Sequence, residues 1–282
     1  MTRRFLPLLA IAALAACDQA PEGEAIVRSE LGGDVAEAEA VPEPEPSPTP
    51  TEPAVPSACK SIEFENIPLT HCVANPSEHR ITMAYGQGSN GRFGSLAAFA
   101  ETVDKRTIAF AINGGPSGDD GKPKGYFVQN KNRIAELDLG NGDGNFYIKP
   151  NGVFYGTGNA WRLRTTPSFY SGVRDRPQFG TQSGPMLLVD GKLPSEISEN
   201  GPSRAIRSGV GIAGDGKAHF VVSQKPLSFG QLARYFRDKA NTKNALFLAS
   251  NRSVLWDPAT KRLDNGSVGP IIVVTKREAP SQ

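Results

Sequence analysis

Hydrophobic residues along the chain gather in short runs that are separated by glycine- and proline-containing segments. Short runs between turn-forming residues are typical of buried β-strands. The pattern predicts strands at 107–112, 185–189, 210–212, 220–222, 245–248 and 270–274. Hairpin turns are predicted at Asp190-Gly191, Asp215-Gly216 and Asn151-Gly152, the last between strands expected at 146–149 and 153–155.

Two segments have helical spacing instead. Residues 95–103 place Leu96 and Phe99 on one face, and Ser228 stands as a helix cap before a second apolar stripe that includes Leu232. No internal repeat is present. The pattern therefore predicts a mixed α/β (α+β) fold, a single domain with one large mixed sheet and flanking helices.

Composition narrows the class of protein. No apolar run reaches the roughly 20 residues needed to cross a bilayer, which excludes a polytopic membrane protein. The formal net charge of +2 combines unlike segments: residues 18–57 carry −9, whereas 28 basic and 19 acidic residues after position 57 give +9. A mildly basic body suits an anionic small molecule or glycan, or solubility alone. Nucleic acid is not expected as a partner, because no dense basic run is interleaved with aromatics.

The first 17 residues have the features of a targeting segment. Arg3 and Arg4 precede an apolar stretch, and Leu14-Ala15-Ala16-Cys17 resembles a bacterial lipobox, in which the cysteine is lipidated. An ordinary signal peptide with a chance cysteine is the alternative. We expect an exported protein, lipid-anchored to the cell envelope on the periplasmic side through Cys17, with the leaflet left open.

Residues 18–57 are acidic and rich in proline, a composition that favours an extended, disordered tether. The folded domain is expected at 58–277 and a short tail at 278–282. Cys59 and Cys72 lie at the start of this domain. In an oxidising compartment two such cysteines most simply form a disulfide, which would close a β-hairpin made from the segments 61–65 and 71–74. A metal site that uses the neighbouring His71 is the alternative, but no further ligand pattern completes it.

The common catalytic motifs are absent. Gly180-Thr181-Gln182-Ser183-Gly184 lacks a central serine and is no nucleophile elbow, and no phosphate-binding P-loop occurs. The three histidines, His71, His79 and His219, have no spacing that suggests a metal pair or triad. No cofactor and no metal are therefore expected.

Polar and glycine-rich loops stand at the ends of the predicted buried strands, where ligand clefts commonly form. Two arginines three residues apart can bind a phosphate or carboxylate, although isolated arginines are usually surface charges. The candidate substrate-binding residues are Asn113, Gly114, Gly115, Gln182, Ser183, Arg204, Arg207 and Ser253.

These loops carry a resemblance to a known family. Ala111-Ile112-Asn113-Gly114-Gly115, Gly144-Asn145-Phe146-Tyr147, the segment 149–154, Thr181 to Leu187, and the segments 203–211 and 229–248 resemble successive blocks of the phosphodiester glycosidase family. The resemblance covers most of the folded region. It implies a mixed α/β domain and hydrolysis of a sugar–phosphodiester linkage at the glycosidic bond, with a phosphorylated glycan or sugar phosphodiester as the partner.

One position departs from the family pattern. Where relatives usually carry Asp-Gly after the strand at 244–248, this chain has Ala249 and Ser250, followed by Arg252. Glycoside hydrolysis normally uses a carboxyl group. Asp119 and Asp120 are weak substitutes, since acids in surface loops are common, so no catalytic residue is assigned. The alternatives are a catalytically inactive phosphoglycan-binding module and a structural envelope protein with a vestigial pocket.

Overall fold

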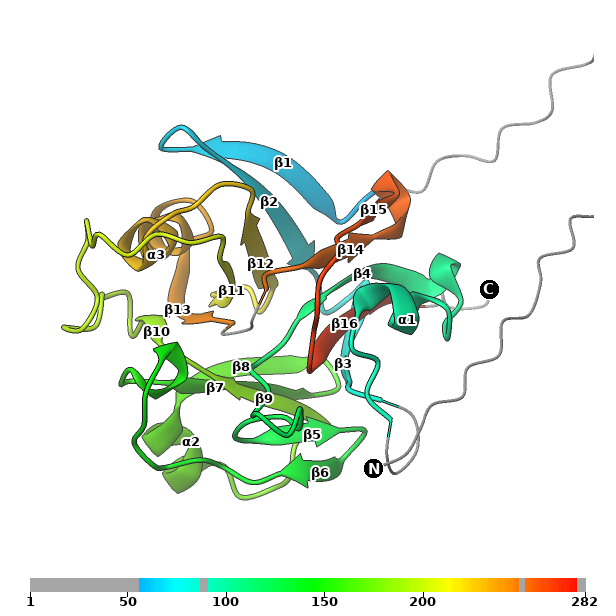
Figure 1. Cartoon of the computed structure of the whole chain (residues 1–282), viewed down its shortest axis with the longest axis horizontal. Coiled ribbons are helices and arrows are strands. Elements are labelled where there is room, and N and C mark those ends of the chain that lie inside the picture. Colours follow the sequence, from blue (N-terminus) through cyan, green and yellow to red (C-terminus); the bar gives the residue numbers. More distant parts are fainter. Residues whose placement is uncertain (1–55, 87–90, 249–251, 278–282) are drawn as a thin grey trace, which may run out of the picture. The chain divides into compact units, whose positions relative to one another are not determined.

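A computed structural model describes residues 56–86, 91–248 and 252–277, and all structural statements below concern these ranges. Their strands form three sheets (Figure 1). The six-stranded sheet contains, in spatial order, β1 (Cys59–Phe64), β2 (Ile67–Ala74), β12 (Ala218–Ser223), β11 (Ser208–Ala213), β13 (Thr242–Phe247) and β10 (Met186–Leu188). One five-stranded sheet contains β15 (Arg262–Leu263), β14 (Leu255–Asp257), β4 (Ile108–Asn113), β16 (Ile271–Lys276) and β3 (His79–Ala84). The other contains β6 (Asn132–Ala135), β5 (Phe127–Gln129), β9 (Phe179–Ser183), β7 (Gly152–Thr157) and β8 (Ala160–Thr165).

The mixed α+β class is confirmed, but the strands are divided among three sheets instead of one large mixed sheet. Every pairing between the named strands is antiparallel. Short connections join many neighbouring strands, and tight hairpins can only link antiparallel strands. The turns at Asp190-Gly191 and Asp215-Gly216 are confirmed, with Asp190, Gly191 and Gly216 at positive φ. The predicted turn at Asn151-Gly152 is wrong.

The β1–β2 hairpin opens the folded region and carries the expected disulfide. Its two-residue turn consists of Glu65 and Asn66, both with positive φ, as the favoured type I′ hairpin turn requires. Cys59 lies directly opposite Cys72 in the pairing of the two strands, and their sulfur atoms are bonded. The predicted disulfide is confirmed. Closing a loop of this length stabilises the fold by about 3 kcal/mol.

The three sheets share one hydrophobic core. Phe110 of β4 and Phe154 of β7 both contact Phe220 of β12, with ring centroids 5.3 and 5.8 Å apart in edge-to-face geometry. All three side chains are fully buried. One aromatic cluster therefore joins residues from each sheet, so the described residues behave as one folded unit.

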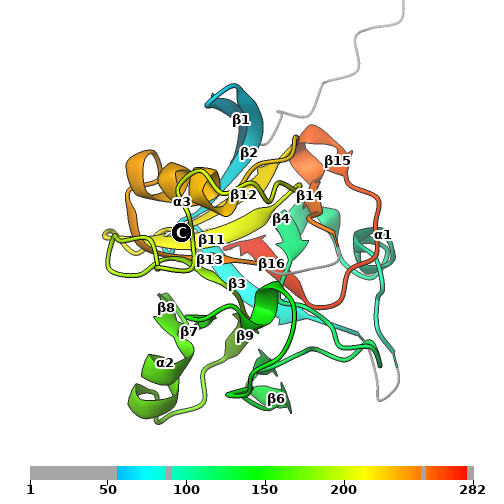
Figure 2. The same cartoon turned by 60° about the vertical axis from the view of Figure 1, so that its left-hand side comes forward.

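Each helix covers a different sheet (Figure 2). The two predicted helices are confirmed as α1 (Leu96–Ala100) and α3 (Phe229–Asp238). Ser228 caps α3 as expected, and Ser95 caps α1. A third helix, α2 (Thr166–Gly172), was not predicted, although Thr165 caps it and a proline stands in its first turn. This helix is too short for its few apolar residues to show a helical period in the sequence.

The predicted strand at 146–149 is instead a 3₁₀ turn, Asn145–Tyr147. The Asn151 side-chain amide donates to the Phe146 carbonyl oxygen (3.0 Å), which closes this segment as a loop. Gly152 then begins β7, whose partners are β8 and β9. These long-range partners, absent from the local pattern, explain why the predicted hairpin does not form.

Several predicted segments fall on residues that the structure does not describe. The lipobox with Cys17, most of the tether and the tail at 278–282 lie outside the described residues, as does Ala249. Their roles and the predicted domain limits stay predictions. Among the helices of the described ranges, none combines the length and the apolar character that crossing a membrane would take.

Two histidines and a tyrosine form a polar chain between β2, β12 and α3. The Tyr235 hydroxyl lies 2.8 Å from His71 Nδ1, and His71 Nε2 lies 2.9 Å from His219 Nδ1. Burial, followed by repulsion from His219 and Lys60, lowers the pKa of His71 to about 4. Burial also lowers the pKa of His219, although nearby Asp215 opposes this shift.

This cluster makes folding stability depend on pH. Between about pH 6.5 and pH 4 the unfolded chain binds a proton at His71 that the folded chain does not, so stability decreases as pH falls. We expect a loss of about 3 kcal/mol from His71 between pH 7 and pH 4. Urea unfolding at several pH values measures it. His71→Gln should remove most of this slope, and an equally steep slope in that variant would contradict the assignment.

Candidate functional site

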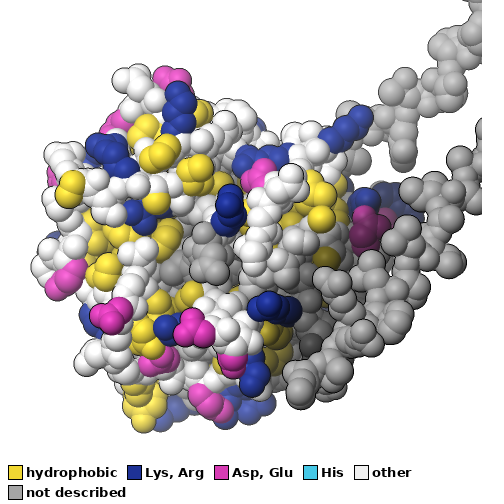
Figure 3. All heavy atoms as spheres, viewed as in Figure 1, with side chains coloured by type: hydrophobic (Ala, Val, Ile, Leu, Met, Phe, Trp, Pro, Cys, Tyr) yellow, Lys and Arg dark blue, Asp and Glu magenta, His cyan; other side chains and the backbone are white. Residues whose placement is uncertain are grey.

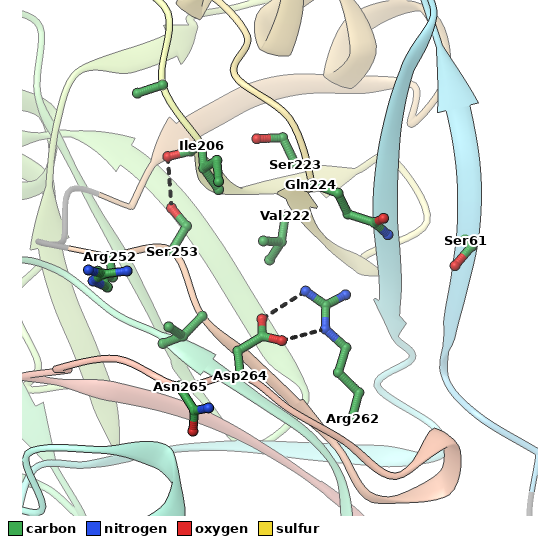
Figure 4. A pocket seen from close by; sticks show the side chains of 12 residues that line it. Ser61, Ile206, Val222, Ser223, Gln224, Arg252, Ser253, Arg262, Asp264 and Asn265 are labelled. Carbon is green, nitrogen blue, oxygen red and sulfur yellow. Dashed lines mark hydrogen bonds and ion pairs between the residues drawn. The ribbon is translucent and has the colours of Figure 1, made fainter.

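A cavity with a volume of about 920 Å³ opens between the end of β12 and the β14–β15 hairpin (Figure 4). Its lining combines hydroxyl, amide, guanidinium and carboxylate groups with a few apolar side chains. The lining residues are Ser61, Ala205, Ile206, Val222, Ser223, Gln224, Arg252, Ser253, Val254, Arg262, Asp264 and Asn265. Such a volume falls within the range of small-molecule sites.

One wall of the cavity is the segment that leads into β14. The Asn113 side chain bonds to a residue on either side of this segment. The Asn113 side chain, fully buried at the end of β4, donates to the carbonyl oxygen of Leu248 (3.3 Å) and accepts from the backbone N–H of Val254 (3.1 Å). The Ser253 hydroxyl on this segment lies 3.4 Å from the Ile206 carbonyl oxygen. Asn113 therefore positions the segment that presents Arg252 and Ser253 to the cavity.

In the opposite wall, the side chain of Thr70 of β2 is hydrogen-bonded to two neighbouring segments. Its hydroxyl lies 3.1 Å from Gln224 Nε2 and 2.6 Å from Arg262 Nη1. These contacts link the end of β12 to the β14–β15 hairpin, which belongs to another sheet. Ser61 of β1 stands beside this wall (Figure 4). The wall is therefore a rigid polar surface.

Asp264 is the one carboxylate among the described residues that line the cavity. Arg262 binds it with two parallel hydrogen bonds, Nε to Oδ1 (2.9 Å) and Nη2 to Oδ2 (2.7 Å). The backbone N–H of Leu255 also donates to Oδ2 (2.9 Å). Both side chains of the pair are about one quarter exposed. The pair is therefore fixed to the first residue of β14.

Arg252 is the second cation of the cavity and differs from Arg262. Within the described ranges it forms no ion pair. On the face shown in Figure 3 the charged side chains of both signs are interspersed and no single-sign patch dominates. Arg252 thus supplies a local positive charge that an anionic ligand could neutralise.

Comparisons with known proteins show to which family this chain belongs. The sequence model of the phosphodiester glycosidase family matches residues 106–249, slightly more than half of the chain. This chain belongs to the phosphodiester glycosidase family. The uncharacterized protein YigE of Escherichia coli (strain K12) is 35% identical over 184 residues, which cover 64% of this chain and 71% of YigE.

Two solved structures share the fold of this chain at low sequence identity. One is the catalytic domain of zebrafish N-acetylglucosamine-1-phosphodiester alpha-N-acetylglucosaminidase, auto-inhibited by its pro-peptide, with a TM-score of 0.52 at 13% identity. The match covers 78% of this chain and 82% of the zebrafish chain. The other is a hypothetical protein from Synechocystis, with a TM-score of 0.51 at 15% identity, covering 78% of this chain and 61% of that one. These likenesses show the fold.

The two arginines predicted to bind a phosphate are directed toward α3 in this phosphodiester glycosidase domain. Arg204 is exposed and donates to Gln231 Oε1 of α3 (2.6 Å). Arg207 is 3% exposed, and its guanidinium lies 3.6 Å from the ring centroid of Phe229. Neither arginine is among the described lining residues of the cavity.

Further hydrogen bonds fix the Arg207 guanidinium. Nε donates to the Leu227 carbonyl oxygen (3.1 Å), and Nη2 lies 3.2 Å from the Ser203 hydroxyl. Burial lowers the pKa of Arg207 to about 10. These contacts fasten the 203–207 loop, whose Ala205 and Ile206 line the cavity. Arg207 therefore positions the loop, and direct substrate binding by either arginine stays a prediction.

Gln182 is also fixed by internal bonds. Its Oε1 accepts from the N–H groups of Tyr126 and Asp138, both at 3.0 Å, and its Nε2 donates to Asp138 O (2.7 Å) and Thr166 Oγ1 (3.2 Å). These four bonds use the full capacity of a side-chain amide. Ser183, the next residue of β9, is buried. Substrate contact by either residue stays a prediction.

The glycine pair after β4 serves close packing. A side chain at Gly115 would overlap the Gln182 carbonyl oxygen, and one at Gly114 would press on Pro270. The Gly115 N–H donates to Thr181 Oγ1 (3.0 Å). Gly115 therefore lets the end of β4 approach β9, and Gly114 lets it approach Pro270 before β16, which gives a packing reason for the Asn-Gly-Gly sequence.

The remaining predicted residues divide between the cavity and the surface. Ser253 lines the cavity as expected of a site residue, whereas Asp119 and Asp120 lie on an exposed turn and are not among its described lining. Asp120 accepts from the Lys122 N–H (2.9 Å). Within the described ranges no cluster of three metal-ligating side chains occurs.

Sequence reasoning missed most of the polar lining: Ser61, Ser223, Gln224, Arg262, Asp264 and Asn265. Ser223 and Gln224 could have been selected, because they directly follow the predicted buried strand at 220–222. The candidate loops of the sequence analysis were chosen for the same position at the end of a predicted strand. No signal marked the others, since their approach depends on how two sheets meet.

Proposed function

We propose that this protein is an exported, lipid-anchored hydrolase that cleaves the glycosidic bond of a sugar-1-phosphodiester in envelope or extracellular glycans. Membership of the phosphodiester glycosidase family supports the reaction class. The zebrafish protein of the same fold is named for action on an N-acetylglucosamine-1-phosphodiester. The single observation that carries the assignment to a site is Arg252, a cavity-lining cation without an ion pair among the described residues.

The cavity offers groups for both parts of such a substrate. Arg252 and the Ser253 hydroxyl can hold the phosphodiester, and positive charge there stabilises the negative charge that develops on the departing phosphate oxygen. The Ser61 hydroxyl and the Gln224 amide face the same space and can hydrogen-bond sugar hydroxyls (Figure 4). The apolar side chains of Ile206 and Val222 border it.

An assay of hydrolysis and binding tests this function. The purified domain is incubated with the methyl phosphodiesters of N-acetylglucosamine, glucose and galactose, each linked at the anomeric carbon, and released reducing sugar is measured. We expect protein-dependent release from at least one diester. Titration calorimetry with the same compounds is run in parallel, and neither product nor binding heat with any of them would contradict the proposal.

The second candidate is a catalytically inactive phosphoglycan-binding module of the same fold. Ala249 stands where relatives usually carry an aspartate, and the cavity's one described carboxylate, Asp264, is paired with Arg262. Binding heat without released sugar in the experiment above would select this alternative.

Export and lipid anchoring rest on separate observations. The segment 1–17 has the charged start, apolar stretch and lipobox-like end described above. The Cys59–Cys72 disulfide supports an oxidising compartment. Metabolic labelling with an alkyne analogue of palmitate tests the anchor in a bacterial host. We expect label on the wild-type protein and none on Cys17→Ser, and an unlabelled wild type would contradict anchoring.

A further inference from the structure

Ala249 stands where the family resemblance implies an aspartate, yet a carboxylate still enters the cavity from elsewhere in the sequence. Asp264 follows β15 and is bonded to Leu255 at both its backbone and its side chain: its N–H donates to the Leu255 carbonyl oxygen (3.0 Å), and its Oδ2 accepts from the Leu255 N–H. Leu255 is two residues after Ser253. Asp264 is therefore anchored to the strand that the Arg252–Ser253 segment enters.

The hydrogen bonds of Asp264 leave it one place for a further donor. An ionised carboxylate has about four acceptor positions, two on each oxygen. Oδ2 accepts from Arg262 Nη2 and the Leu255 N–H, whereas Oδ1 accepts from Arg262 Nε alone among the described residues. Figure 4 shows the carboxylate between Arg262 and the Arg252–Ser253 segment. A water molecule in the cavity can therefore donate to Oδ1.

The pairing with Arg262 determines which chemical role this carboxylate fits. Three N–H donors already bond to the Asp264 oxygens, so the carboxylate is oriented as a hydrogen-bond acceptor, which is the arrangement that a general base offers to a water molecule. A phosphodiester is already a good leaving group, so its departure depends less on protonation by an acid. The remaining requirement is activation of water at the anomeric carbon.

We propose that Asp264 is the general base of this protein and replaces the aspartate absent at position 249; the proposal rests on the proposed hydrolase function. In the step, the water oxygen forms a bond to the anomeric carbon while the bond from that carbon to the phosphate oxygen breaks. The bonding electron pair leaves with the phosphate, giving a phosphate monoester beside Arg252. One water proton passes to Asp264 and then to solvent, and the sugar is released with a free anomeric hydroxyl.

Two variants of Asp264 test the role. Asp264→Asn should lower kcat for the best diester by about 10²- to 10⁴-fold. KM and the binding heat should stay close to wild type, because a base acts in the transition state and not in ground-state binding. Asp264→Ala removes the carboxylate but leaves space, so added formate should restore part of its turnover. Restoration by formate is an effect that a merely structural ion pair would not produce.

Asp257 provides the matched control. It lies in the same hairpin, is 1% exposed, and accepts hydrogen bonds from Ala259 N–H and the Ser57 and Thr260 hydroxyls, but it is not among the described lining residues. Asp257→Asn should lower the melting temperature and leave kcat unchanged. Equal loss of kcat in Asp257→Asn and Asp264→Asn would overturn the proposal.

Three results separate the possible failures. Turnover by wild type together with unchanged turnover by Asp264→Asn overturns the role of Asp264 and leaves the proposed function standing. A fall in kcat that formate does not restore in Asp264→Ala, with binding also lost, reduces Asp264 to a structural residue and overturns the proposal. Absence of turnover by wild type itself overturns the proposed function and the base together.

Discussion

Arg252→Ala is expected to lower kcat/KM for a sugar-1-phosphodiester by about 10²- to 10³-fold, the usual effect of removing a charge-assisted donor from a developing anion. Arg252 lines the cavity, is exposed, and forms no ion pair within the described ranges. Its loss should therefore change the free energy of unfolding by less than about 0.5 kcal/mol. Steady-state kinetics and thermal unfolding of the purified variant measure the two effects.

Two variants control this result. Arg252→Lys keeps the charge but loses the forked geometry of the guanidinium, so we expect it to recover part of the activity. Arg162→Ala removes an exposed arginine of β8, which belongs to neither the sheet of β12 nor the sheet of β14 and β15. This variant should leave kcat/KM at the wild-type value. Wild-type turnover in Arg252→Ala would exclude the phosphodiester from this part of the cavity.

Arg207→Ala is expected to destabilise the fold by about 3 kcal/mol, because it removes a buried cation–π contact and the guanidinium's hydrogen bonds to the Leu227 carbonyl oxygen and the Ser203 hydroxyl. For a domain of this size the melting temperature should fall by roughly 6–12 °C. Differential scanning calorimetry measures the change. A substrate-binding arginine would instead leave stability nearly unchanged when it is removed.

Arg204→Ala is the matched control for Arg207→Ala, since Arg204 stands on the same loop but is exposed. Its hydrogen bond to Gln231 should contribute less than about 1 kcal/mol. If Arg207→Ala unfolds at the wild-type temperature, the positioning role of Arg207 is wrong.

The parts of the fold that local sequence determines were predicted well. The β1–β2 hairpin has its turn residues, its alternation and its two cysteines within 16 residues, and the disulfide follows from the pairing register. Ser95 and Ser228 mark helix starts because a hydroxyl at the N-cap satisfies backbone N–H groups of the first turn. Hairpin turns at Asp190 and Asp215 are equally local.

Features that depend on distant contacts were not predicted. The division into three sheets follows from strand pairings between residues far apart in sequence, such as β2 with β12. The Thr70–Arg262 bond, which closes one wall of the cavity, joins residues separated by 192 positions. No periodicity or spacing reports such a contact.

The candidate site shows the same limit at the level of single side chains. A loop position does not say whether an arginine faces a ligand or an aromatic ring, and Arg207 contacts Phe229. Likewise, Gln182 was selected for its polar loop but uses its whole amide internally. Ser253 was selected because its loop follows a predicted buried strand, and it lines the cavity, but its contact with a substrate stays a prediction.

The proposed hydrolase function requires that the phosphodiester binds in the cavity between β12 and the β14–β15 hairpin. A crystal structure of the Asp264→Asn variant with a bound sugar-1-phosphodiester tests it most directly. We expect the phosphate within hydrogen-bond distance of the Arg252 guanidinium and the anomeric carbon facing residue 264. A phosphate bound instead beside Gly115 and Gln182, or against Arg204 and Arg207, would contradict it.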